Sequence, residues 1–196
     1  NITTLCALIV GLAGCYKPIP DPTLSVTDSQ YLAKVPKFEV EMEYRRYHVD
    51  DPTGEPPGTI VVDTKKHFLY FVLPGKKAIR YGVATGNESQ GWTGTAEVRR
   101  KAEWPRWMPP AEMIERWPHL KPTYDAGGLP GGPDNPLGAR ALYLYQGNKD
   151  TLFRIHGTNE PETIGRDASS GCIRMANIDA IDLYNRVQLG TKVIVK

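Results

Sequence analysis

The sequence has 196 residues, which is enough for one domain preceded by an unstructured lead. Hydrophobic residues make up 40% of the chain and charged residues 23%, which is ordinary for a globular protein, and the net charge of +2 gives no support to a nucleic-acid partner. Cys6 and Cys15 lie in the first apolar stretch, so Cys172 alone lies in the body of the chain, and a disulfide framework is excluded.

The chain starts with an apolar run, residues 5–14, that leads into Cys15. The run is too short to cross a bilayer, which takes about 20 residues, but it suits the hydrophobic region of a signal peptide. The sequence Leu-Ala-Gly-Cys at 12–15 resembles the lipobox of bacterial lipoproteins. We therefore predict a truncated lipoprotein signal segment at 1–15, with lipid on Cys15 anchoring the protein to a membrane in the bacterial periplasm. Tyr16, where an aspartate would indicate retention at the inner membrane, favours the outer membrane. The alternative is a buried apolar segment.

Residues 16–57 lack clear periodicity and are rich in proline, which predicts a tether with some local order that packs against the domain through residues 38–47. From residue 58 to residue 196 the sequence predicts one β-rich domain. Its strands are runs rich in Val, Ile, Tyr and Phe that are separated by turn residues. The predicted strands are 59–63, 68–73, 78–83, 141–145, 152–155 and 192–195.

Two helices are predicted in the domain. The first, residues 110–117, opens with a proline, which suits the first helical turn. The second, about residues 178–187, follows Asn177 as its predicted N-cap and stops before Gly190. The surrounding stretch 104–136 is rich in Trp, Pro and Gly. A long segment with little regular structure is usually functional, so we predict that it forms a lid or a wall over a site.

The candidates for catalysis are His156 and Cys172. His156 ends a predicted strand, and Cys172 follows it by 16 residues, which is enough for a loop that returns the thiol to the imidazole. A cysteine nucleophile needs a base that takes its proton and then holds the thiolate as an ion pair, and such pairing lowers the pKa of the thiol. The backbone amides of Gly171 and Cys172 would form the oxyanion hole.

Other interpretations of these residues stay open at this point. A single cysteine is more often an inert core residue, and a histidine at a strand end is often structural. A zinc site needs three or four ligands, and His48, His67 and His119 lie in unrelated contexts, so we predict no metal. The glycine pairs of the chain do not form a loop that could hold a nucleotide phosphate.

A known motif favours the catalytic interpretation of His156 and Cys172. The sequence His-Gly-Thr at 156–158, followed by Ile-Gly at 164–165 and Ser-Ser-Gly-Cys-Ile-Arg-Met at 169–175, resembles the signature of the L,D-transpeptidase family. The first strands of the domain and its last helix and strand are similar too, so the resemblance covers residues 58–196. It implies a mainly β fold with short helices, built as a single β-sandwich catalytic domain.

The resemblance also implies roles in catalysis. Cys172 would be the nucleophile and His156 the base, with the backbone carbonyl of Gly157 orienting the imidazole. The backbone amide of Gly171 would serve the oxyanion. No metal and no organic cofactor are implied.

The candidate substrate-binding residues are Arg174, Ser169, Ser170 and Thr158. Arg174 has an alternative role as a salt bridge within the fold, and Ser169 has one as a loop-shaping hydrogen bond. Ser170 stands where the family motif has a histidine. Any role of that histidine must therefore be absent here or be taken by a hydroxyl or water.

The reaction implied is a two-step acyl transfer on peptidoglycan stem peptides. Cys172 would attack the amide between meso-diaminopimelate and the terminal D-alanine of a tetrapeptide stem, and D-alanine would leave after protonation by His156. An amine of a second stem would give a cross-link, an amine of an envelope protein would anchor that protein, and water would make the enzyme a carboxypeptidase. A lipoprotein that only binds peptidoglycan is the non-catalytic alternative, and the intact thiol and imidazole argue against it.

Overall fold

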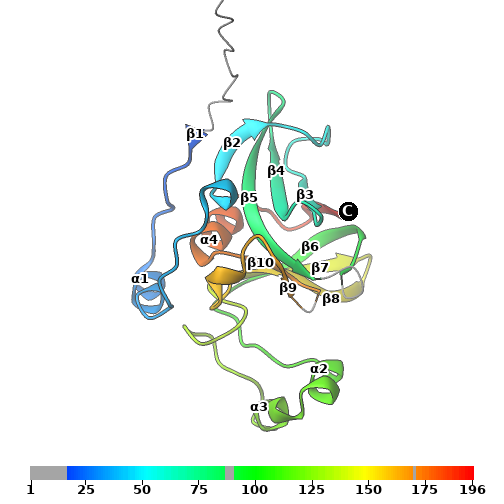
Figure 1. Ribbon diagram of the computed structural model, residues 1–196. Helices are drawn as coiled ribbons and strands as arrows, with labels where there is room; N and C mark the ends of the chain where they lie inside the picture. The colour runs from blue at the N-terminus through cyan, green and yellow to red at the C-terminus, as the bar shows by residue number, and fades with distance from the viewer. Residues whose placement is uncertain (1–16, 87–90, 170) are drawn as a thin grey trace, which may run out of the picture.

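The computed structural model describes residues 17–86, 91–169 and 171–196. The predicted signal segment with Cys15, and the candidate residue Ser170, lie outside these ranges. Figure 1 shows a strand-rich body with helix α4 packed against it, an N-terminal segment along one side, and a lobe with two short helices that projects away from the strands.

Strands dominate the described residues, and the predicted mainly β fold with short helices is confirmed. The strands are β1 (Lys17–Pro18), β2 (Tyr47–Asp50), β3 (Ile60–Asp63), β4 (Phe68–Leu73), β5 (Lys77–Gly86), β6 (Gly94–Glu103), β7 (Arg140–Gln146), β8 (Lys149–His156), β9 (Asp167–Ser169), β10 (Ile173–Met175) and β11 (Lys192–Val195). The helices are α1 (Val26–Leu32), α2 (Ala111–Arg116), α3 (Lys121–Asp125) and α4 (Asn177–Arg186), with short 3-10 turns η1 (Met42–Tyr44), η2 (Pro118–Leu120) and η3 (Pro161–Thr163).

Strand β5 closes the sheet on itself. One edge of β5 pairs with β2 and β10, and the opposite edge pairs with β4 and β9. From β10 the strand order continues through β8, β7, β6, β11 and β3 to β4, which returns to β5. The strands therefore enclose a single core, with two halves of the sheet facing each other as in a sandwich.

The core follows from the alternation of side chains along the strands. Inward-facing residues of every part of the ring are fully buried, among them Ile60, Leu69, Tyr81, Leu144 and Ile155. Helix α4 adds its apolar residues to the same core. Residues between the inward-facing ones point to the outer face of the sheet, and the residues predicted to act in catalysis lie there.

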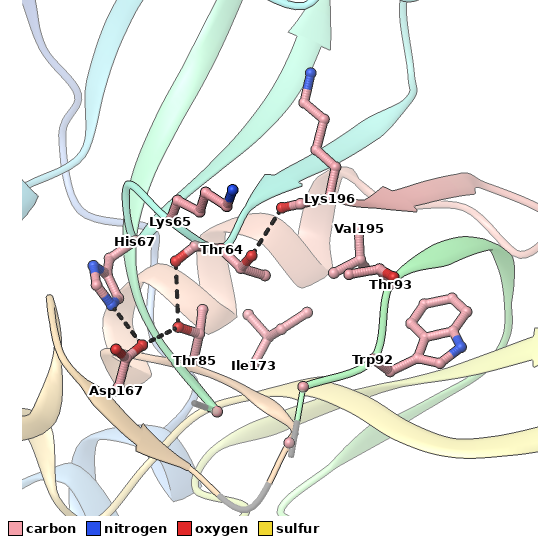
Figure 2. A pocket seen from close by; sticks show the side chains of 13 residues that line it. Thr64, Lys65, His67, Thr85, Trp92, Thr93, Asp167, Ile173, Val195 and Lys196 are labelled. Atoms are coloured by element: carbon pink, nitrogen blue, oxygen red, sulfur yellow. Dashed lines mark hydrogen bonds and ion pairs between the residues drawn. The ribbon is translucent and has the colours of Figure 1, made fainter. Parts of the chain in front are cut away.

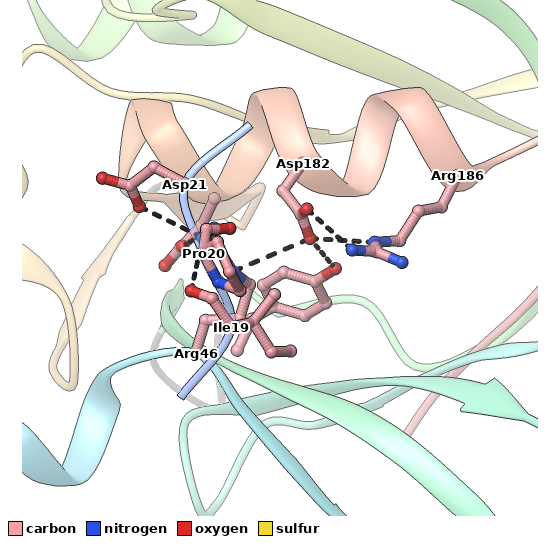
Figure 3. Close-up of polar contacts among 8 residues, drawn as sticks. Ile19, Pro20, Asp21, Arg46, Asp182 and Arg186 are labelled. Carbon is pink, nitrogen blue, oxygen red and sulfur yellow. Dashed lines mark hydrogen bonds and ion pairs between the residues drawn. The ribbon is translucent and has the colours of Figure 1, made fainter. Parts of the chain in front are cut away.

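The N-terminal segment, predicted as a tether, packs against the domain. Arg46 is buried, and its guanidinium donates to Asp179 at 2.6 Å. It also donates to Asp21 at 3.1 Å and lies 3.8 Å from Asp182 (Figure 3). Burial raises the pKa of the Asp179 carboxyl to about 7, against the opposing effect of the Arg46 charge. Gly82 is required beneath this segment, since a Cβ there would lie 2.4 Å from the backbone oxygen of Tyr44.

Helix α1 is the second contact between this segment and the domain. The Ser25 hydroxyl accepts from the Asp28 amide, and the Asp28 carboxylate accepts from the Ser25 amide, so α1 starts with a capping box. Asp28 also accepts two hydrogen bonds of 2.8 Å from Arg140 and one of 2.9 Å from the Trp104 indole. Burial acts to raise the pKa of Asp28, but these bonds outweigh it and hold that pKa well below its usual range.

The stretch 104–136 contains more regular structure than predicted. It carries α2, η2 and α3, and Figure 1 shows this lobe projecting away from the strands. Asn135 closes its base, because its side-chain amide donates to three backbone carbonyls. A lid function for the lobe stays a prediction. Among the described residues, no helix is both long and apolar enough to cross a membrane.

Candidate active site

Strands β8 and β10 lie side by side in parallel and bring the candidate residues together. Ile155 pairs with Ile173, and His156 pairs with Arg174. Because both isoleucines face the core, His156 and Arg174 face outward. Cys172, one residue before β10, has the same outward direction by alternation.

His156 is held as a neutral base. Its side chain is 5% exposed, and Nδ1 lies 2.6 Å from the carbonyl oxygen of Gly157. A carbonyl only accepts, so Nδ1 carries the proton and Nε2 is left as an acceptor. Burial lowers the pKa of the imidazole to about 4, although the Gly157 contact acts in the opposite direction. The ring can therefore take a proton at neutral pH.

The thiol of Cys172 is partly buried and protonated in this arrangement. Burial raises its pKa, while the backbone amide and charge of Arg154 and the charge of Arg174 act to lower it. The expectation that pairing with His156 lowers this pKa is wrong for this conformation, in which Sγ contacts the carbonyl of Leu152 at 3.9 Å and burial raises the pKa of the thiol. The thiol and the imidazole are thus both neutral before substrate arrives.

Leu152 owes its position to an irregularity in β8. The pairing of β7 with β8 shifts register near this residue, and Leu152 has a φ of 64°, which is unusual for a leucine. Its side chain is 67% exposed. Backbone strain of this kind is often found at functional sites, and here it coincides with the carbonyl that faces the candidate nucleophile.

The loop before Cys172 is shaped by Ser169. The Ser169 hydroxyl donates to the backbone carbonyl of Cys172 at 2.5 Å and accepts from the Gly171 amide at 3.2 Å. With these two hydrogen bonds, the Ser169 hydroxyl has the loop-shaping role in this structure. The Gly171 amide, predicted as an oxyanion donor, is engaged by this hydroxyl and would have to exchange partners to serve an oxyanion.

Arg174 and Thr158 also make contacts within the fold. Arg174 donates to Glu160 at 2.7 Å, so the salt-bridge role is present in this structure. The Thr158 hydroxyl is buried and accepts from the Glu160 amide at 3.0 Å. Thr158 thereby shapes the turn after His156 and directs Glu160 toward Arg174.

Asn177 is a site residue whose contacts were not predicted. It was expected as the N-cap of the last helix, but Ala176 is the cap and Asn177 is the first helical residue. Its side-chain oxygen accepts from the amides of Ala139 (2.8 Å) and Thr158 (3.1 Å), and its nitrogen donates to the Thr158 carbonyl at 2.7 Å. A Cβ at position 157 would lie 2.2 Å from that oxygen, so only glycine fits there.

Arg154 also received no role from the sequence. It lies beside Cys172 in the register of β8 and β10, and it donates two hydrogen bonds to Asp150 at 2.6 and 2.8 Å. Its guanidinium lies 4.4 Å from the centroid of the Tyr143 ring. A strand sequence alone does not say which residues face one another across the sheet, so no local signal identified this residue.

A cavity of about 420 Å³ lies close to the site but on the core side of β10 (Figure 2). His67 and Thr85 both contact Asp167 in its wall, at 3.0 and 3.1 Å. Trp92 also lines it and stacks on Phe153 with ring centroids 5.7 Å apart. Gly171, the residue before Cys172, also lines this cavity.

In the ranges that the structure describes, no group of three or more His, Cys, Asp or Glu side chains could hold a metal ion.

The sequence model of the YkuD family, described as an L,D-transpeptidase catalytic domain, matches residues 57–195.

Individual proteins match over similar lengths. A putative L,D-transpeptidase of Bacillus subtilis, YqjB, is 32% identical over 74% of this chain and 76% of its own. A probable L,D-transpeptidase of Escherichia coli, YbiS, is 34% identical over 68% of this chain, which spans 43% of that longer protein. A crystal structure from Brucella melitensis, named as a probable carnitine operon oxidoreductase caia, is 52% identical with a TM-score of 0.55, covering 80% of this chain and 96% of that one.

Proposed function

The chain belongs to the L,D-transpeptidase catalytic-domain family, and we propose that it is a peptidoglycan L,D-transpeptidase with Cys172 as nucleophile and His156 as base. The observation that carries the proposal is the contact of Nδ1 with the Gly157 carbonyl, which leaves Nε2 unprotonated. His156 ends β8, and Cys172 directly precedes β10, the strand that pairs with β8. The proposal follows the family and this geometry rather than the oxidoreductase name of the Brucella protein.

The first half-reaction forms the acyl-enzyme. As Sγ of Cys172 bonds to the carbonyl carbon between diaminopimelate and D-alanine, its proton passes to Nε2 of His156. The C–N bond then breaks, and the imidazolium returns the proton to the amine of the departing D-alanine. Since both groups start neutral, the proton moves during attack rather than before it.

The second half-reaction releases the product. The acceptor amine attacks the thioester carbonyl while Nε2 of His156 takes its proton. The C–S bond breaks, and the thiolate regains a proton from the imidazolium. An amine of a second stem peptide gives a cross-link, and an amine of an envelope protein gives an anchored protein.

Two guanidiniums flank the reacting groups and support an anionic substrate. Arg154 and Arg174 both act on the thiol and on the imidazole through their charge. The partner of Arg174, Glu160, is about half exposed, so a substrate carboxylate can replace it without disturbing the core. Arg174 is therefore proposed as a ligand for a stem-peptide carboxylate.

The setting of the reaction is part of the same proposal. Lipid on Cys15 would hold the protein at a membrane in the bacterial periplasm, with the outer membrane favoured. The support is the lipobox-like sequence at 12–15. Labelling cells with a radioactive fatty acid and comparing the protein with its Cys15→Ala variant tests the anchor; equal labelling of both would exclude it.

Mass spectrometry of the protein incubated with a disaccharide-tetrapeptide tests the reaction. We expect a cross-linked dimer with loss of D-alanine from the wild type, none from Cys172→Ala or His156→Gln, and normal product from His67→Gln as a histidine control outside the site. Released D-alanine with tripeptide alone would indicate a carboxypeptidase. Substrate that stays intact but bound to all four proteins would favour a non-catalytic peptidoglycan-binding lipoprotein.

A further inference from the structure

A row of four residues crosses the outer face of the sheet and ends at Cys172. Arg100 of β6 pairs with Tyr143 of β7, and Tyr143 pairs with Arg154 of β8. The parallel register of β8 and β10 then places Cys172 beside Arg154. Figure 1 shows these strands next to one another in the lower part of the body.

The two arginines of this row share one aromatic ring. The guanidinium carbon of Arg100 lies 4.3 Å from the centroid of the Tyr143 ring, and that of Arg154 lies 4.4 Å from it. Because both guanidinium carbons lie within 4.4 Å of the same centroid, they are at most roughly 9 Å apart. The ring itself is buried, so it holds both cations in place.

Strand irregularities create this alignment. The pairing of β6 with β7 shifts register between Val98 and Arg100, which leaves Arg99 without a cross-strand partner on β7 and places Arg100 opposite Tyr143. Bulges near active sites commonly re-aim a side chain in this way.

The charge of the row is not balanced within the fold. Arg154 is paired with Asp150. Arg100 is exposed and has no carboxylate within ion-pair distance in the part of the chain that the structure describes. With Arg174 beside His156, the outer face offers three guanidiniums along one path to the thiol.

The length of the row matches a short peptide. Neighbouring strands are about 4.8 Å apart, so three spacings separate the strand of Arg100 from that of Cys172 by about 14 Å. An extended peptide advances about 3.3 Å per residue, so the row is as long as roughly four residues.

We propose that the row of Arg100, Tyr143 and Arg154 binds the part of the donor peptide that precedes the scissile bond, with Arg100 binding a carboxylate of that peptide. The inference rests on the proposed function and adds how the donor is selected. A guanidinium held over an aromatic ring presents a planar fork of N–H donors, which matches a carboxylate in two hydrogen bonds. The row then lays the peptide across the strands with its reactive carbonyl at Cys172.

Two donor peptides that differ at one carboxylate test the proposal. One is the tetrapeptide with a free α-carboxylate on the glutamate at its second position, and the other is the same peptide with that group amidated. We expect amidation to lower kcat/KM for D-alanine release by about 10-fold in the wild type, the scale of a charge-assisted hydrogen bond. The Arg100→Gln variant should lose about the same factor with the free carboxylate and show no further loss on amidation.

Arg99→Gln is the matched control. It removes the same charge from the adjacent residue, whose guanidinium bonds to Glu97 instead of lying in the row. It should retain the wild-type preference for the free carboxylate. If Arg100→Gln behaves like Arg99→Gln, or if amidation lowers the rate equally in both variants, the proposal is overturned.

Binding measured on Cys172→Ala separates this inference from the proposed reaction. Calorimetry with the two peptides should show about 10-fold weaker binding of the amidated one, and Arg100→Gln in the same background should abolish the difference. If the wild type releases no D-alanine but this preference is present, the reaction fails and the binding row stands. Equal binding of both peptides with normal turnover overturns the row and leaves the reaction intact.

Discussion

Asn177 should control catalysis through the position of His156. The Gly157 carbonyl that accepts from the imidazole belongs to a turn, and the next residue of that turn, Thr158, is held by both its amide and its carbonyl on the Asn177 side chain. The informative change is Asn177→Asp, which keeps the shape and the accepting oxygen. It replaces the donor to the Thr158 carbonyl with an oxygen that repels it.

The size of the effect follows from burial. Asn177 is 7% exposed, so the Thr158 carbonyl loses its donor where water has little access. An unsatisfied buried group costs about 1–3 kcal/mol, and repulsion between two oxygens adds to it, so we expect a loss of about 2–4 kcal/mol in the free energy of unfolding. A shift of about 1 Å in a catalytic group can cost about 100-fold in rate. We therefore expect kcat to fall about 10- to 100-fold at pH 7.5, with KM nearly unchanged.

The assay is D-alanine release as a function of pH, beside thermal unfolding. A protonated aspartate can donate to the Thr158 carbonyl, so the kcat of Asn177→Asp should recover toward the wild-type value as pH falls from about 8 to about 5.5. Asn135→Asp is the control, since Asn135 is as deeply buried and donates to three carbonyls at the base of the lobe. If both variants lose similar stability and both keep kcat within about 2-fold of wild type, Asn177 has a structural role only.

Alkylation of Cys172 by iodoacetamide, followed by mass spectrometry, should be slow at pH 7 and rise through pH 9, because burial raises the pKa of the thiol; a plateau of fast alkylation below pH 7 would instead indicate a preformed ion pair. Arg46→Leu leaves the Asp179 carboxyl buried without its cation and should cost about 3–5 kcal/mol of stability. The folded-state pKa of the Asp179 carboxyl is raised above its unfolded value, so the stability that this group contributes is lost as pH rises through the folded-state pKa. The drop in Tm caused by Arg46→Leu should therefore be larger at pH 8 than at pH 6. Equal drops at the two pH values would contradict this assignment. Asp28→Ala removes the carboxylate that accepts two hydrogen bonds from the buried Arg140 guanidinium, which keeps the exposed Glu103 carboxylate at 3.7 Å, and should cost about 3–5 kcal/mol in urea unfolding; a loss below about 1 kcal/mol would show that α1 contributes little.

The strands that the sequence predicted are those with a strong local pattern. Strand β3 and strand β4 are runs of β-branched and aromatic residues, and both lie where they were expected. Strand β6 was missed although it has 10 residues, because Gly94–Glu103 is rich in charged residues and alanine. Its pairing with β7 and β11 outweighs that weak propensity.

The site residues that the sequence predicted are likewise those with a local motif. The motif singled out His156 and Cys172, because both lie within one short stretch of sequence; in the structure His156 ends β8 and Cys172 directly precedes the neighbouring strand β10. The contacts of Asn177 with Ala139, and of Arg154 with Tyr143, join residues from distant parts of the chain through register and loop packing. The direction in which the pKa of the Cys172 thiol shifts depends on burial, which no local sequence pattern determines.

The docking of the N-terminal segment has a consequence for how far the enzyme can reach. A free tether of about 40 residues would keep its ends roughly 35 Å apart and would let the domain explore a wide volume. Instead, β1 pairs with β2, β2 pairs with β5, and Arg46 ties the same segment to α4. If lipid on Cys15 anchors the protein as proposed, the folded body starts at Lys17, two residues further on. The thiol would then work within about one domain diameter of the membrane, roughly 40 Å, and would act on the layer of wall nearest to it.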